Sequence, residues 1–171
     1  MKFDFYPVRS LLAILKNKSS SIDVLSHPAF QTVVSHSARL GEGVTLNDIS
    51  AALMGQESPY FGMQHAYTNV AAMETLLEYV VRHQDSWLQE IQTAVSKVFP
   101  PKLVDPIIIC PIIGYDAGIG HNNHVCVNIN RWVYWNRPWE LLYVIIHEAC
   151  HAAHENYHPL PSLHNGHLSS D

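Results

Sequence analysis

The chain has 171 residues and a formal net charge of −5, and its ten lysines and arginines are scattered along the sequence. A nucleic-acid binder concentrates cations on one surface, so this composition argues against nucleic acid as a partner. At 47% hydrophobic and 15% charged residues, the chain has enough apolar material for one folded core and too little charge for disorder.

Several other classes of protein are also disfavoured. No run approaches the ~18 apolar residues of a membrane span, and Asp4 and Pro7 interrupt the region where a signal peptide is apolar. Cys110, Cys126 and Cys150 are too few and too far apart for a disulfide framework or a zinc knuckle. We therefore expect no membrane partner and a cytoplasmic location, while the oligomeric state is not indicated.

The first hundred residues predict helices. Leu11, Leu12, Ile14 and Leu15 recur at near-helical spacing, after a Pro7 that suits a first turn. A second helix is expected from Pro28 to Leu40, ending at Gly41 or Gly43. Thr45 and Asp48 resemble a capping box that opens a short helix ending near Gly55.

Two further helices are expected before residue 100. The first is amphipathic and covers Tyr67 to His83, and Asp85 is expected to cap the second. Pro100 and Pro101 should end the second helix, and they mark the main change of character along the chain.

The region after these prolines predicts a small sheet. Ile107–Ile113 is a short β-branched run in which Pro111 favours an edge strand or a bulge. Gly114, Gly118 and Gly120 indicate a loop, and His124–Ile129 alternates as a second strand. The expected class is α+β, with a mixed or antiparallel sheet from Ile107 to Ile129.

The last predicted helix is buried and ends near Tyr157. Asn136 is a plausible N-cap, Pro138 suits the first turn, and Pro159 disfavours continuation at His158. The stretch Leu141–Ile146 is apolar on nearly every face, which is typical of a helix inside the core.

This helix carries the sequence His-Glu-Ala-Cys-His. His147 and His151 are four residues apart and project from one face, so both imidazoles can reach one metal ion. Glu148 lies beside that face, within reach of a water on the metal. Two histidines with an adjacent carboxylate are typical of a zinc hydrolase, so we assign His147 and His151 as zinc ligands and Glu148 as general base.

A third zinc ligand is not identified by the sequence. His154 is two turns from His147, and we expect it at the rim of the site and not on the metal. The residues past the helix that remain as candidates are His158, His164, His167 and Asp171. A ligand outside this chain is a further alternative.

Three other features admit two interpretations each. The residues His121-Asn122-Asn123-His124 suit a second metal, but we favour a polar loop leading into an edge strand. We expect the three tryptophans of this region to anchor the final helix rather than line a substrate groove; they are Trp132, Trp135 and Trp139. Cys150 could in principle be a soft metal ligand, but we expect it to be a buried thiol.

From Ile107 to Glu155 the chain resembles the gluzincin-like predicted zinc-dependent proteases of bacterial domain families of unknown function. The residues that carry the resemblance are an apolar strand, a Gly-rich loop, the strand Val125–Ile129 and the helix from Trp139 to the motif. The resemblance implies that a substrate peptide lies along an edge strand beside the zinc helix. Such families usually supply a Glu ligand from a later helix. After Glu155, the one acidic residue in this sequence is Asp171.

We therefore expect a single zincin-like domain over 1–171, with a helical part over 1–101 and the sheet and zinc helix over 102–171. The expected activity is zinc-dependent hydrolysis of a peptide or protein substrate, complete in this chain or as a piece of a larger protein. The alternatives are a regulatory peptidase of the repressor-cleaving type and a non-catalytic zinc-binding or interaction module.

Overall fold

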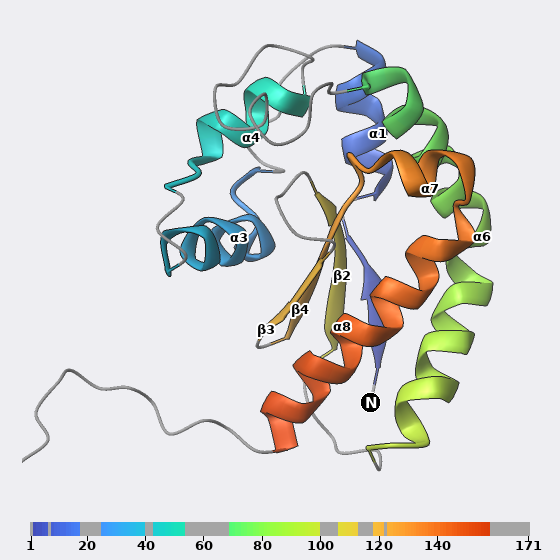
Figure 1. Cartoon of the computed structure of the whole chain (residues 1–171). Helices are drawn as coiled ribbons and strands as arrows, with labels where there is room; N and C mark the ends of the chain where they lie inside the picture. The colour runs from blue at the N-terminus through green and yellow to red at the C-terminus, as the bar shows by residue number, and fades with distance from the viewer. Residues whose placement is uncertain are drawn as a thin grey trace, which may run out of the picture.

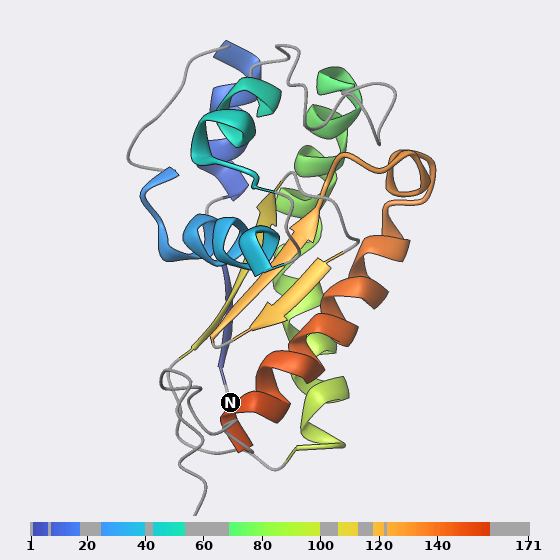
Figure 2. The ribbon, with the colours of Figure 1, turned by 60° about the vertical axis from the view of Figure 1, so that its left-hand side comes forward.

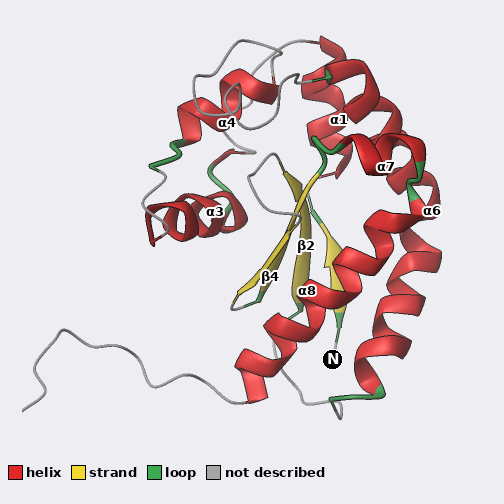
Figure 3. Cartoon of the chain, in the orientation of Figure 1, coloured by secondary structure: helices red, strands yellow, loops and turns green. Residues whose placement is uncertain are grey.

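A computed structural model describes residues 2–6, 8–17, 25–39, 43–53, 69–99, 106–112, 118–121 and 123–157. Within these ranges, a small mixed sheet is flanked by helices, which confirms the expected α+β class (Figure 1 and Figure 3). The elements in chain order are β1 (Phe3–Phe5), α1 (Val8–Asn17), α3 (Pro28–Arg39), α4 (Leu46–Leu53), α6 (Val70–Ser96), β2 (Ile107–Ile112), β3 (Gly118–His121), β4 (His124–Asn128), α7 (Trp132–Asn136) and α8 (Trp139–Tyr157).

The sheet has the strand order β1-β2-β4-β3. The first three strands in this order are parallel, and β3 pairs antiparallel with β4 at the edge. The mixed alternative is therefore correct. Two strands were not expected: β1 lies at the N-terminus, and β3 contains Gly118 and Gly120, which the sequence analysis wrongly assigned to a loop.

Pro111 occupies an interior strand, although a proline favours an edge. The amide of Ile107 donates to Lys2 and the carbonyl of Ile109 accepts from Tyr6, so odd-numbered residues of β2 face β1. The pairing with β1 ends at Ile109, so the nitrogen of Pro111 points past the end of β1. The missing N–H therefore costs no ladder hydrogen bond.

The N-terminal helices follow their predicted signals. The first expected helix is α1, and the second begins at Pro28 as predicted, although residues 40–42 lie outside the described residues. At the start of α4, the amide of Thr45 donates to the carboxylate of Asp48 at 2.9 Å, and the amide of Asp48 donates to the Thr45 hydroxyl at 3.2 Å. These reciprocal bonds confirm the capping box.

The two helices expected between residues 67 and 100 are one helix. α6 runs 27 residues from Val70 to Ser96, and Asn69 caps it by accepting a hydrogen bond from the amide of Ala72 at 3.0 Å. Asp85 does not cap a new helix, because it is a residue in the middle of α6. No glycine or proline interrupts this stretch, so nothing in the sequence forces the helix to stop.

Helices cover both faces of the sheet. α8 packs on β3 and β4, and α6 packs on β1 and α8, while α3 packs on β2 and β4 from the opposite side (Figure 2). None of the helices within the described part of the chain is both long and apolar enough to cross a membrane. The arrangement places α8 directly beside the edge strand β3.

Candidate metal-binding and catalytic site

The motif helix α8 begins two residues later than expected, at Trp139. Asn136 does not cap it, because Asn136 is the last residue of the short helix α7. The chain turns at Arg137 and Pro138, whose carbonyls accept from the amides of Glu140 and Leu141 at 3.0 and 3.1 Å. α8 is described as far as Tyr157, and the predicted stop at His158 lies outside the described residues.

α8 is buried on most faces but has one open row of side chains. Within residues 139–155 the exposed positions are Trp139, Tyr143, His147, His151 and His154. The two motif histidines were expected to be buried with the helix, and this was wrong. They lie on the open face of α8, next to the side on which β3 contacts the helix at Glu148 and His151.

The two motif histidines converge. Their Nε2 atoms are 3.1 Å apart, and their rings are nearly perpendicular at 81°. Two nitrogens bound to one tetrahedral zinc at ~2.0–2.1 Å are separated by about 3.3–3.4 Å. The spacing of His147 and His151 is therefore close to that of two ligands of one zinc ion.

Glu148 follows His147 on α8 and packs against the edge strand β3. Its side chain is 9% exposed. A Cβ added to Gly118 would lie 2.7 Å from Cγ of Glu148, and one added to Gly120 would lie 1.9 Å from the carbonyl oxygen of Glu148. The same Cβ on Gly120 would lie 3.0 Å from Cβ of His151. Only glycine permits β3 to approach the motif this closely.

These two glycines lie at the candidate site, where neither was expected. They are separated by one residue, so in a strand both face the same side, here toward α8. The spacing Gly-x-Gly just before an alternating strand is the signal that points to a close approach of a helix.

The charge of Glu148 affects two nearby groups. Burial raises the pKa of the Cys126 thiol on β4 to about 12, with Glu148 as the second cause. Burial also raises the pKa of Tyr134 on α7, opposed by the positive charge of Arg131 and supported by Glu140 and Glu148. The carboxyl of Glu148 therefore lies within electrostatic reach of both the sheet and α7.

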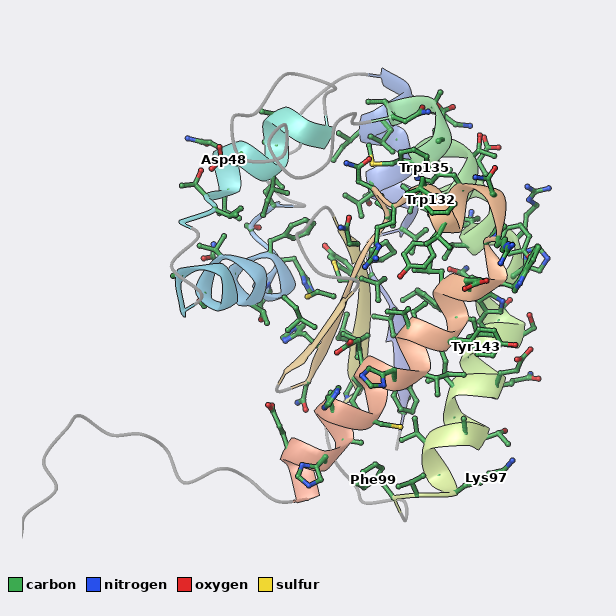
Figure 4. The ribbon with its side chains drawn as sticks, viewed as in Figure 1. Asp48, Lys97, Phe99, Trp132, Trp135 and Tyr143 are labelled. Carbon is green, nitrogen blue, oxygen red and sulfur yellow. The ribbon has the colours of Figure 1, made fainter. Side chains whose placement is uncertain are left out.

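No third ligand is assembled within the described ranges. Among those residues, there is no group of three or more His, Cys, Asp or Glu side chains placed to hold a metal. His154 packs edge-on against Phe99, which Figure 4 labels, with 6.3 Å between the ring centres. The other candidates lie outside the described residues: His158, His164, His167 and Asp171.

The second histidine cluster joins two strands. His121 ends β3 and His124 begins β4, and the two are paired in register. The strand that follows is therefore interior, not the edge strand that was expected. The ring of His124 meets that of His27 edge-on at 5.7 Å, and His27 stacks on Tyr6 at 4.1 Å.

The tryptophans and Cys150 are in part more exposed than expected. Trp132 is 72% exposed and Trp139 is 51% exposed, so neither anchors α8 in the core. Trp135 is half-buried, and its indole N–H donates to the carbonyl of Ile129 at 2.9 Å, as an anchor would (Figure 4). Cys150 is a free, half-buried thiol.

Comparison of the chain with protein-family models, with curated proteins and with solved structures finds no match.

Proposed function

We propose that the chain is a zinc-dependent metallopeptidase in which His147 and His151 hold the metal and Glu148 is the general base. The observation that carries this proposal is the convergence of the two Nε2 atoms to 3.1 Å on the exposed row of α8. Glu148, which is next to His147 in the sequence, is 9% exposed and packs against Gly118 of the edge strand. A purely structural zinc site has no need of a base at that position.

The protein's own groups account for the proton transfers and for orientation. Zinc, when bound, supplies a Lewis acid that lowers the pKa of a water toward ~7 and polarises a carbonyl. The carboxylate of Glu148 accepts the proton of the attacking water and returns it to the leaving amine. The packing of Glu148 against Gly118 limits the rotamers of its side chain.

The edge strand offers a place for the substrate backbone. Among the described strands, β3 is paired only with β4, so its other edge has unpaired backbone groups. An extended peptide can add to such an edge through main-chain hydrogen bonds. A peptide held there lies beside α8, as the resemblance to gluzincin-like proteases implies.

The test separates metal binding from catalysis. We expect Glu148→Gln to retain zinc but to lose peptide hydrolysis, because an amide cannot accept the proton. His147→Ala and His151→Ala should lose zinc and the stabilisation that zinc gives the folded state. Glu155→Gln, on the same helix but two turns from Glu148, is the matched control and should retain both zinc and activity.

Full activity in Glu148→Gln would refute the proposed mechanism. Stoichiometric zinc with no hydrolysis of any peptide would instead favour the non-catalytic zinc-binding module. The cytoplasmic location stays a prediction.

A further inference from the structure

The open row of α8 continues from the histidines into two aromatic residues. Trp139, Tyr143, His147 and His151 recur every four residues, and all four are exposed. Each step advances by about 6 Å along the helix and turns by about 40° around it, so the row crosses the open face diagonally. Figure 4 shows Tyr143 on α8, between α7 and the C-terminal turns of the helix.

The two aromatic side chains are exposed, unlike most of the other apolar residues of α8. Tyr143 is 68% exposed and Trp139 is 51% exposed, whereas the positions beside them on the helix are buried or half-buried. Aromatic side chains that are left open next to a reactive centre are candidates for contact with a ligand. They add nothing to the core of this chain.

The charges beside the row cancel locally. Arg137 and Glu140 form an ion pair at 3.2 Å, at the N-terminal end of α8. The row therefore presents aromatic surface without a net charge from these two neighbours. An apolar side chain fits such a surface better than a charged one does, because a charged group would lose hydration without gaining a partner.

The spacing of the row matches an extended chain. Steps of about 6 Å correspond to about two residues of a β-strand, which rises ~3.3 Å per residue and turns alternate side chains to the same side. The two glycines of β3 meet successive turns of α8, at Val144 and Glu148 and then at Glu148 and His151. β3 therefore runs in the same direction as α8.

We infer that Tyr143 and Trp139 determine substrate specificity by binding bulky apolar side chains at alternate positions of an extended polypeptide. This inference rests on the proposed peptidase function. The substrate class it names is an unfolded or extended segment with aromatic or large aliphatic residues two apart. Tyr143 contacts the side chain nearer to the metal site, and Trp139 the next one on the same side.

The test measures peptide binding without hydrolysis. The probes are two fluorescein-labelled nine-residue peptides of Gly and Ser with two Phe, separated by one residue in the first and adjacent in the second. Binding to the zinc-loaded Glu148→Gln chain is followed by fluorescence anisotropy. We expect the first peptide to bind about 10-fold tighter, because only its two rings can stack on both aromatic residues.

Two substitutions and a control identify the surface. Tyr143→Ser and Trp139→Ser, each in the Glu148→Gln chain, should bring the two affinities to within about 2-fold of each other. Val98→Ser replaces an apolar side chain that is 64% exposed beyond the end of α6, and it should leave the preference intact. Circular dichroism checks that each variant is folded.

The outcomes for specificity and for hydrolysis are separate. Equal binding of the two peptides, or a preference that survives both Tyr143→Ser and Trp139→Ser, would overturn the specificity role even if the chain with Glu148 cleaves peptides. A preference that these substitutions abolish supports the role. If the zinc-loaded chain with Glu148 then cleaves neither peptide, it is the proposed hydrolysis that fails.

Discussion

Gly120 of β3 and Glu148 of α8 approach so closely that a Cβ on Gly120 would lie 1.9 Å from the carbonyl oxygen of Glu148. The contact is with backbone, which cannot rotate away as a side chain can. The edge strand and the motif helix are therefore held together at the residue that we assign as the base. A shift of β3 would therefore also shift the backbone of α8 at Glu148.

We predict that Gly120→Ala destabilises the protein and weakens zinc binding. The added methyl must push β3 away from α8, and overpacking of this kind costs about 1–3 kcal/mol. The same methyl would press on Cβ of His151, 3.0 Å away, and disturb the histidine pair. Urea denaturation and zinc titration measure the two effects.

Gly118→Ala is the informative partner of this variant. Its Cβ would lie 2.7 Å from Cγ of Glu148, a side chain that can change rotamer, and 3.2 Å from Cγ1 of Val144. We expect a smaller loss of stability than in Gly120→Ala, with zinc binding retained and peptide hydrolysis reduced at least about 10-fold as the carboxylate moves. An unchanged kcat in a folded Gly118→Ala chain would contradict the placement of the base.

The next prediction concerns the third zinc ligand. A catalytic zinc has three protein ligands, and the motif supplies two. We expect alanine at one of His158, His164 and His167 to weaken zinc binding as much as His151→Ala does. If none does, Asp171→Asn tests the remaining candidate. Unchanged affinity in all four variants would place the ligand outside this chain or leave a two-histidine site.

Local patterns predicted the parts of the fold that depend on neighbours in sequence. The capping box at Thr45 and the start of α3 at Pro28 both follow from capping and proline rules that act within one turn. The motif spacing likewise predicted that His147 and His151 meet, since residues four apart share a helix face.

Features that depend on distant pairing were not predictable in this way. β1 and β3 are three and four residues long, too short for a periodic signal, and each becomes a strand only by pairing with β2 or β4. The exposure of His147 also depends on which side of α8 the sheet contacts. An apolar run such as Leu141–Ile146 does not reveal that side.

The prediction for pH concerns His27. Partial burial lowers the pKa of His27 below its ordinary value of 6.5, and the nearby His124 lowers it further. The unfolded chain then binds more protons than the folded one as pH falls below about 6.5, so the free energy of unfolding decreases there. His27→Phe retains a ring against Tyr6 and should flatten this decrease, measured by urea denaturation at pH 7.5 and 5.5.

His124→Asn tests the second cause. Removing the charge of His124 should raise the pKa of His27 partway and reduce the decrease without abolishing it. A pH dependence that is the same in the parent chain and in His27→Phe would show that other groups are responsible.

The last prediction compares two buried asparagines that lie two residues apart. Asn128 and Asn130 are each 2% exposed. The side-chain oxygen of Asn128 accepts the amide of Asn130 at 2.9 Å, whereas neither polar side-chain atom of Asn130, as the described chain stands, has a hydrogen-bond partner. A buried polar group without a hydrogen-bond partner lowers the free energy of unfolding by about 1–3 kcal/mol. Removing a buried acceptor that has a partner leaves the group that donated to it unpaired, at a similar cost.

The two leucine substitutions should therefore have opposite signs. Asn130→Leu has a similar volume and should raise the free energy of unfolding by about 1–3 kcal/mol, because it removes two unpaired groups. Asn128→Leu should lower it by about 1–3 kcal/mol, because it leaves the amide of Asn130 without an acceptor. Urea denaturation of both variants under identical conditions gives the comparison. If Asn130→Leu instead destabilises the chain, we infer that the side-chain amide of Asn130 binds an ordered water or a ligand, and that this contact stabilises the folded state.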